Sequence, residues 1–448
     1  MNPEANFITS LLNIDPSIIE SCATHTDTET VIYEITLKRT DMPCQYCGGK
    51  TISYGHKTKK INHPVLRNRT SYILYHENRY QCKDCRKITS DSNPFTMPGF
   101  NSSTLLLQQV MKMFGNLNYT LDMISKELNI STTQLNTYLD SFITIPKRPL
   151  PECLGIDEIH NRSLAKSTSP YLCILVDNEN HCLYDVLGTR AKFSLGDHFS
   201  NIPREERLRV KYISIDMWEP YRDLAAAYFP NALVAVDPFH VIEHLTDDFD
   251  KLRISLMRQC EYHSNGYYLL KNWHWLLETD DVDLDNNRVY NHRFGTELNR
   301  RDILDLIFET FPILHDAYEL KEMYRKFNKV SYYDDAVDFF PKIQKYFAEC
   351  GIAQYSEFSG ILSNWKEEII NSFRRPYNDR KLSNAYTENI NGKLRNYFSI
   401  ARGVKNFDRF RKRAIFALNP KISYALTDKL HSDSYKGRQR GPYQKIKD

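Results

Sequence analysis

Three carboxylates in this sequence stand where they could share a divalent metal ion. Asp157 lies in the short apolar segment L-G-I-D-E-I (154–159), and Asp216 follows the apolar segment V-K-Y-I-S-I (210–215). A carboxylate in such a strand is costly to bury unless it meets a cation or lies at an open strand end. The third acid, Glu388, lies in a segment with a helical pattern. We therefore predict that two strands and a helix bring these three acids together.

The chemistry of such a site follows from its ligands. Carboxylate oxygens suit Mg²⁺ or Mn²⁺, which also bind phosphate oxygens. Two such ions about 3.5–4 Å apart can activate a water or a 3′-hydroxyl and stabilise the leaving oxygen of a phosphoryl transfer. An acid on a helix is usually only solvated, so Glu388 is a candidate metal ligand only because Asp157 and Asp216 are also present. The pattern predicts two Mg²⁺ or Mn²⁺ ions held by the three acids.

The helix expected around Glu388 has two distinct faces. Its polar face comprises Asn384, Glu388, Asn391 and Arg395, and apolar residues fall on the opposite side. The polar face can therefore line a cleft while the apolar face packs on a sheet. We predict that Asn384, Asn391 and Arg395 support the three acids.

Two further polar residues follow the strand expected beside the one that carries Asp216. Asp237 and His240, in V-D-P-F-H, could border the metal ions. An alternative that the sequence leaves open is a satisfied strand-end aspartate and a histidine that caps a helix. Because side chains alternate along a strand, Glu158 should point away from Asp157 and have a structural or supporting role.

Four cysteines form two closely spaced pairs near the N-terminus, Cys44/Cys47 and Cys82/Cys85. Each C-x-x-C lets two thiolates turn onto one ion, so together the pairs predict a closed, structural Zn²⁺ site of four thiolates. The 34 residues between the pairs contain alternating segments that suit a zinc ribbon with an extended hairpin. Basic residues in this region are predicted to face DNA phosphates. They are Lys57, Lys59, Lys60, Arg67 and Arg69.

A helical pattern follows the zinc ribbon. Residues 119–128 and 132–142 are expected to form two short helices, the second capped by Ser131. This is the spacing of a helix-turn-helix, although any pair of short packed helices looks similar. Its second helix would present three polar residues to base edges, namely Thr133, Gln134 and Asn136.

Beyond a proline-containing linker the pattern changes to strands. Three short strands between 152 and 188, a helix, the strand that precedes Asp216, a helix, and the strand 233–237 follow one another. This is the element order of the ribonuclease H-like fold. A long helical stretch then separates Asp216 from Glu388. The predicted fold class is multidomain α/β, with an N-terminal zinc ribbon, a helix-turn-helix and a ribonuclease H-like catalytic domain interrupted by an all-helical insertion.

The expected boundaries follow these changes of pattern. They are a zinc-ribbon domain (1–95), a helix-turn-helix domain (100–146), the first part of the catalytic core (152–258), a helical insertion (259–376), the last helical region of the core (377–420) and a basic tail (421–448).

The charge is unevenly distributed. The net charge of the 448 residues is only +3, but 36–90 carry twelve Lys and Arg against three acids, and 381–448 carry sixteen against five. Two basic regions around an acidic middle favour a polyanion such as double-stranded DNA as the partner, although either could be a solvated surface. The second includes a cluster expected to bind phosphates. Its members are Arg409, Arg411, Lys412 and Arg413.

The remaining composition narrows the class of protein. With 41% hydrophobic and 26% charged residues the chain is not a disordered one. No export signal and no apolar run of about 18 residues is seen, so a membrane is not expected as a partner. We expect a cytoplasmic protein that associates with the nucleoid when it binds DNA.

The motifs together resemble those of the DDE transposases of bacterial insertion sequences, specifically the ISL-three family. The motifs are the two C-x-x-C pairs, the helix-turn-helix, G-I-D-E-I (155–159), S-I-D-M-W-E-P-Y-R (214–222), V-D-P-F-H-V (236–241), L-L-K-N-W (269–273) and S-N-A-Y-T-E-N-I-N-G-K-L-R (383–395). The resemblance implies that Asp157, Asp216 and Glu388 are the catalytic acids, and that a helical insertion precedes the glutamate.

The function expected from this resemblance is binding of the terminal inverted repeats of an insertion sequence, metal-dependent cleavage, and joining of the 3′ ends to target DNA. Cutting two ends together implies at least a homodimer on DNA. The alternative is a non-catalytic DNA-binding regulator derived from such an enzyme, which needs the zinc ribbon and the helix-turn-helix but not the acids.

Overall fold

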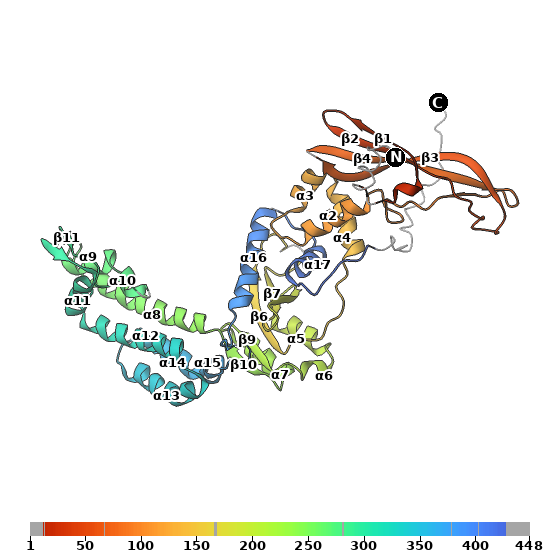
Figure 1. Ribbon diagram of the computed structural model, residues 1–448. Coiled ribbons are helices and arrows are strands. Elements are labelled where there is room, and N and C mark those ends of the chain that lie inside the picture. The colour runs from red at the N-terminus through yellow and green to blue at the C-terminus, as the bar shows by residue number, and fades with distance from the viewer. Residues whose placement is uncertain are drawn as a thin grey trace, which may run out of the picture. The chain divides into compact units, whose positions relative to one another are not determined.

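The computed structural model describes residues 12, 14–66, 68–164, 168–279, 282–377, 379–401 and 403–426. The chain is a mixed α/β protein that divides into two compact units. One unit comprises 1–147, 161–167 and 392–448, and the other comprises 148–160 and 168–391. Figure 1 shows the elements of each. No helix among the described residues is both long and apolar enough to cross a bilayer.

The first unit contains a five-stranded sheet. Its strands are β1 (Ile19–Thr26), β2 (Thr30–Leu37), β3 (Thr51–Leu66), β4 (Arg69–Cys82) and β5 (Ile88–Ser90). The order is β1-β2-β4-β3, with β5 on β4, and only the β2–β4 pair is parallel. The hairpin of β3 and β4 is the extended hairpin expected between the cysteine pairs, but it is longer than its two alternating segments indicated.

The strands β1 and β2 were not predicted, because the first 35 residues gave no clear signal. The sequence also predicts a short helical piece near residues 7–12, which lies outside the described residues except for Leu12. A 3-10 turn, η1 (Pro16–Ile18), precedes β1. In β2 alternate side chains are buried, and these are Val31, Tyr33, Ile35 and Leu37. That period of two was the missed signal, since it is typical of a strand with one buried face.

Three helices follow the sheet in the same unit: α2 (Thr104–Phe114), α3 (Leu121–Leu128) and α4 (Thr132–Phe142). Each begins at a hydroxyl N-cap, namely Ser103, Thr120 and Ser131. The αL conformation of Asn129, with φ 51°, ends α3 and allows α4 to begin three residues later. The second helix therefore starts where Ser131 predicted it.

The second unit contains the other five-stranded sheet. Its strands are β6 (Cys153–His160), β7 (Tyr171–Asp177), β8 (Cys182–Leu187), β9 (Tyr212–Ile215) and β10 (Leu233–Val236), in the order β10-β9-β6-β7-β8. Strands β6, β9 and β10 are parallel, whereas β7 and β8 run antiparallel to their neighbours. The strands expected from the sequence are all present.

Helices connect these strands. They are α5 (Lys192–Ser200) and α6 (Arg204–Arg207), where one helix was expected, and α7 (Glu219–Tyr228). Residues of β6, β7 and β9, such as Leu154, Leu175 and Ile213, are fully buried. A core this continuous fixes the sheet register and with it the positions of the strand ends.

A long, mainly helical segment follows β10. Its helices are α8 (Pro238–Gln259), α9 (Asn265–Asn272), α10 (Trp275–Glu278), α11 (Arg300–Thr310), α12 (Pro312–Val330), α13 (Tyr333–Glu349), α14 (Tyr355–Asn364) and α15 (Lys366–Ser372). The prediction that it is all-helical is wrong, because β11 (Val289–Asn291) and β12 (Thr296–Leu298) form a two-stranded hairpin. The turn of this hairpin uses Gly295 at φ 66°.

Two helices complete the described chain: α16 (Ala385–Ala401), which bears Glu388, and α17 (Phe407–Leu418). Residues of α16 up to 391 belong to the second unit, and those from 392 belong to the first. Helix α17 packs against α2 and α4 in the first unit. Most of the predicted tail 421–448 lies outside the described residues.

Candidate active site

Asp157 and Asp216 meet because β6 and β9 are parallel neighbours. The register pairs Gly155 with Ser214 and Ile156 with Ile215, so the next residue on each strand is an aspartate. Asp157 is only 9% exposed. Oxygens of Asp157, Asp216 and Glu158 lie within 4.8 Å of one another. The sheet therefore brings together the two strand-borne acids that the sequence singled out.

Burial of these acids disfavours their charged forms. Desolvation raises the pKa of Asp157 from 3.8 to about 6, partly opposed by the hydrogen bond from the Glu158 N–H. It raises the pKa of Asp216 from 3.8 to about 7, with further contributions from the charges of Glu158 and Asp157. A cation between the two aspartates would reverse both effects, because an opposite charge favours the ionised carboxylate.

The atoms of Asp216 fit a cation site. Its Oδ1 is buried and has no hydrogen-bond partner among the described residues. An unpaired buried carboxylate oxygen is unfavourable, whereas a hard divalent ion takes such an oxygen as a ligand. The donor set of this cluster therefore suits Mg²⁺ or Mn²⁺.

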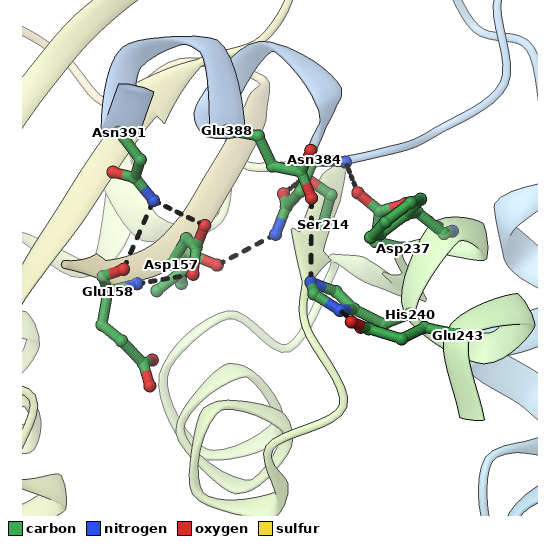
Figure 2. A network of polar contacts seen from close by, with 11 residues as sticks. Asp157, Glu158, Ser214, Asp237, His240, Glu243, Asn384, Glu388 and Asn391 are labelled. Atoms are coloured by element: carbon green, nitrogen blue, oxygen red, sulfur yellow. Dashed lines mark hydrogen bonds and ion pairs between the residues drawn. The ribbon is translucent and has the colours of Figure 1, made fainter. Parts of the chain in front are cut away.

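Glu158 has other partners. Its carboxylate accepts hydrogen bonds from the Arg190 guanidinium and from the Tyr221 hydroxyl, the latter at 3.0 Å. Figure 2 shows its side chain leaving β6 on the side away from Asn391, as the alternation of a strand predicts. The closeness of a Glu158 oxygen to those of Asp157 and Asp216 was not expected, because strand alternation predicted that Glu158 points away from Asp157. Asp216 lies just beyond the end of β9.

Glu388 lies in the first turn of α16. Its Oε1 is 3.8 Å from Nε2 of His240, and Nδ1 of His240 is 3.0 Å from the Glu243 carboxylate. Burial alone would lower the pKa of His240, but the hydrogen bond with Glu243 and the charges of Asp237 and Asp216 raise it overall. A histidine between two carboxylates can thus hold Glu388 toward the strand ends (Figure 2).

Asn384 ties the start of α16 to the sheet. Its Nδ2 donates to the Ile156 carbonyl at 3.2 Å, and its Oδ1 accepts from the Ser214 hydroxyl at 2.5 Å. The Ser214 oxygen in turn accepts from Asn178 at 2.7 Å. These four residues, which we call the Asn384 tether, link β6, β9 and the end of β7 to the helix that carries Glu388.

About two turns beyond Asn384, Asn391 contacts Asp157. Its Nδ2 donates to Asp157 Oδ2 at 2.7 Å and to the Glu158 carbonyl at 3.3 Å. The helix approaches β6 closely: a Cβ atom at Gly155 would lie 2.5 Å from Thr387 Oγ1. Only glycine at position 155 leaves room for α16 at this distance.

Asp237 is a helix cap that also holds α16. Its carboxylate accepts from the Phe239 N–H at 2.9 Å, as N-cap of α8, and from the Asn384 N–H at 2.8 Å. Asp237 is thus a satisfied strand-end aspartate, whereas His240 contacts Glu388. Arg395 is exposed and belongs to the other unit, so its supporting role stays a prediction.

The four predicted cysteines come together in the first unit. Sγ of Cys44 is 3.6 Å from that of Cys85, and Sγ of Cys47 is 3.5 Å from that of Cys82. Four thiolates around Zn²⁺, with bonds of about 2.3 Å, have sulfur–sulfur edges of about 3.8 Å. Backbone N–H groups two residues beyond Cys44 and Cys82 point to their sulfurs, each at 3.4 Å. The cluster fits one structural zinc ion.

The basic residues of the β3–β4 hairpin differ in their partners. Lys57 and Lys60 are exposed, and the Lys60 ammonium lies 3.7 Å from the centre of the Tyr72 ring. Lys59 pairs with Glu77 at 2.5 Å, which makes it a weaker candidate for phosphate contact. Arg69 is half-buried, and Arg67 lies outside the described residues.

The polar residues of α4 also differ in their exposure and partners. Thr133 is exposed, and Asn136 is half-buried in a cavity of about 370 Å³. The Gln134 amide donates to the hydroxyls of Ser102 and Tyr138, at 3.3 and 2.5 Å. Contact between Gln134 and a base edge would require this amide to leave both partners.

Helix α17 carries the C-terminal basic cluster. Arg409 forms a two-pronged ion pair with Asp140 of α4, with Nη2 2.7 Å and Nε 3.0 Å from Oδ2. The Lys412 ammonium lies 3.4 Å from the Asp140 carbonyl. Arg411 is half-buried, and it remains a candidate for phosphate contact together with Lys412.

Arg413 cannot contact DNA in this structure, so its assignment to the phosphate-binding cluster is corrected. It is 2% exposed, and its guanidinium donates to the carbonyls of Asn116 and Tyr119. Burial lowers the pKa of Arg413, and the Tyr397 hydroxyl partly offsets this effect. The helical spacing of Phe410, Ala414 and Leu418 placed Arg413 next to the apolar face, and that was the signal for a structural role.

Comparison with known proteins yields one assignment. The family model for DDE transposases of the ISL-three type, described as "Transposase", matches residues 154–414, which include Asp157, Asp216 and Glu388. No curated protein matches the chain. Because the match spans more than half of the sequence, this chain belongs to the ISL-three family of transposases.

Proposed function

We propose that this protein binds the terminal inverted repeats of an insertion sequence, cleaves DNA there and joins the 3′ ends to target DNA. The observation that carries the proposal is the meeting of Asp157 and Asp216 at neighbouring strand ends, with Glu388 on a helix tethered to the same strands. The order and mixed directions of the strands in the second unit support a ribonuclease H-like fold for this domain.

The three acids would hold Mg²⁺ or Mn²⁺. Such ions, when bound, polarise a scissile phosphate and lower the pKa of a bound water or 3′-hydroxyl. The protein's part is positioning. Asn391 donates to Oδ2 of Asp157 and the Glu158 N–H donates to Oδ1, so both oxygens are held in place. The Asn384 tether holds the start of α16, the helix that carries Glu388, against the sheet. Preorganised ligands of this kind avoid reorganisation during the reaction.

The first unit supplies the proposed DNA-binding elements. The sequence and structure support a zinc ribbon with a basic hairpin, and the α3–α4 pair is compatible with a helix-turn-helix whose exposed Thr133 faces DNA. Exposed lysines such as Lys57 would contribute phosphate contacts. We propose that the enzyme acts as a homodimer or larger assembly on two ends.

Cleavage of end DNA tests this function. The purified protein with Mg²⁺ or Mn²⁺ should nick a duplex that carries the element's end, whereas Asp216→Asn should bind the same duplex and not cut it. Wild-type cleavage by Asp216→Asn would exclude this site. End binding without cleavage by the wild-type protein under any metal condition would favour the DNA-binding regulator.

A further inference from the structure

The mainly helical segment after β10 contains a cavity of about 800 Å³ that the proposed chemistry does not use. It is bounded by α9, the residues around α10, the β11–β12 hairpin and the start of α11, elements that pack on one another (Figure 1). All of its lining residues belong to the second unit. Cavities that bind small organic groups commonly have volumes of about 300–1,000 Å³.

The walls of this cavity are aromatic. Trp273 and Trp275 line it with ring centres 6.0 Å apart, together with Tyr268 and Tyr290. Tyr290, on the hairpin, is 52% exposed, so its ring is available to a ligand. Rings at a cavity wall give a planar group a surface on which to stack, and a nucleobase is such a group.

The charge of the cavity is positive. Two guanidiniums line it, and no Asp or Glu does. Arg293 donates to the Asn265 side chain and the His263 carbonyl, and Arg300 donates to the Asp283 carbonyl. All these acceptors are neutral, and neither guanidinium has an ion pair with a carboxylate among the described residues. Two positive charges without an internal counter-ion favour an anionic ligand.

Polar groups that could recognise a base edge are also present. Asn286, Asn291 and Asn299 line the cavity. Their side-chain amides offer both hydrogen-bond donors and acceptors to a base edge.

We propose that this cavity binds one unpaired nucleotide of a DNA strand, with its base against the tryptophan and tyrosine rings and its phosphate near Arg293 and Arg300. The proposal rests on the proposed function, because it takes DNA as the substrate. Stacking is tolerant of base identity, since every base has a π-face. The cavity would therefore recognise that a nucleotide is unpaired rather than which base it carries.

Fluorescence of 2-aminopurine tests this site in the full-length protein. Two duplexes of the same end sequence are compared without added Mg²⁺ or Mn²⁺, one fully paired and one with three unpaired nucleotides that include 2-aminopurine. The wild-type protein should bind the second duplex about 5- to 150-fold more tightly, the range expected for stacking of one base, and should change the emission of 2-aminopurine. Equal affinity for the two duplexes would overturn the proposal.

The variants test the residues. Tyr290→Ala lies at an exposed position and should keep the fold, yet together with Arg300→Gln it should abolish the preference for unpaired DNA. Arg301→Gln is the matched control, because the Arg301 guanidinium pairs with Asp285 and does not line the cavity. A preference that survives Tyr290→Ala and Arg300→Gln would contradict the assignment.

Two further outcomes separate the possible errors. If deoxyadenosine monophosphate binds as tightly as the unpaired strand, the cavity is a site for free nucleotides and the proposal is wrong. If the protein binds the paired duplex normally but shows no preference, only the cavity assignment fails. If it binds neither duplex, the proposed transposase function fails with it.

Discussion

The four cysteines of the first unit and the acids of the second are two contrasting ways to gather side chains that could hold a metal ion. Each pair of cysteines is local, with two residues between its members, and backbone N–H groups of the same turns point to the sulfurs. The acids Asp157, Asp216 and Glu388 are distant in sequence. Parallel strands bring the two aspartates together, and a tethered helix carries Glu388. The four sulfurs of the first arrangement are close enough together to enclose one ion. The second holds an unpartnered oxygen of Asp216, and its third acid, Glu388, is half-buried and lies outside the group of carboxylates whose oxygens are within 4.8 Å of one another.

This difference indicates different contributions to folding. Thiolates that surround Zn²⁺ contribute binding energy to a small domain directly. Buried carboxylates held close together repel one another until a cation joins them, so the second site should make the metal-free protein less stable. The predictions below test that contrast.

Cys82→Ser should have the largest effect. The variant should lose the one zinc ion per chain, because three ligands with a weak hydroxyl no longer close the site, and structural zinc contributes about 10–16 kcal/mol in small zinc domains. Elemental analysis checks the zinc content. Cys153→Ser, which changes a buried cysteine of β6 outside the cluster, is the control and should keep its zinc. Full zinc content in Cys82→Ser would refute the four-thiolate site.

Asp216→Asn should remove a pH-dependent loss of stability. Burial raises the folded-state pKa of Asp216 from 3.8 to about 7. The folded protein therefore binds this proton more tightly than the unfolded chain does. The associated stability is complete below about pH 4 and is lost as the pH rises to about 7, by at most about 4 kcal/mol.

Urea unfolding without added Mg²⁺ or Mn²⁺ at pH 5 and pH 8 measures this effect. The wild-type protein should lose stability over that interval, Asp216→Asn should lose less, and Mg²⁺ should restore the wild-type protein only. An identical loss of stability in both proteins would show that the ionisation of Asp216 does not cause it.

Asn384→Ala should destabilise the protein by about 1–3 kcal/mol, the usual cost of leaving a buried polar group unsatisfied. The variant leaves the Ser214 hydroxyl and the Ile156 carbonyl without their partner. Asn396→Ala, on the same helix but with only an exposed hydrogen bond to Asn118, should change stability by less than about 0.5 kcal/mol. Equal effects on the urea midpoint would mean that the Asn384 tether contributes nothing specific.

The smallest effect concerns α17. The double variant Arg411→Gln, Lys412→Gln should flatten the dependence of DNA affinity on log salt by up to about two contacts, each worth a slope of about 0.9. Arg413→Gln should instead lower the unfolding midpoint, because Arg413 is buried. DNA-binding titrations at several salt concentrations measure this slope. An unchanged slope in the double variant would mean that the basic residues of α17 are only a solvated surface.

The sequence predicted the features that are determined by residues close together in the chain. The cysteine pairs, the Ser131 cap and the catalytic-domain strands follow from spacing and period, and the structure contains all of them. The contacts between distant residues could not be predicted. Ser214 and Asn384 are 170 positions apart, and nothing in either local pattern indicates that they bond. The unexpected closeness of Glu158 to Asp216 is likewise a contact between distant residues.

The most direct test of the carboxylate site compares two glutamates. Glu388→Gln and Glu158→Gln are assayed side by side for cleavage of end DNA with Mg²⁺, at protein concentrations where both bind the duplex fully. Glu158 is already paired with Arg190 and Tyr221, whereas Glu388 faces the strand ends beside His240. We predict that Glu388→Gln loses at least about 1,000-fold in rate, equivalent to about 4 kcal/mol, and that Glu158→Gln stays within about 10-fold of the wild type. The reverse result would make Glu158 the third metal ligand and contradict the site.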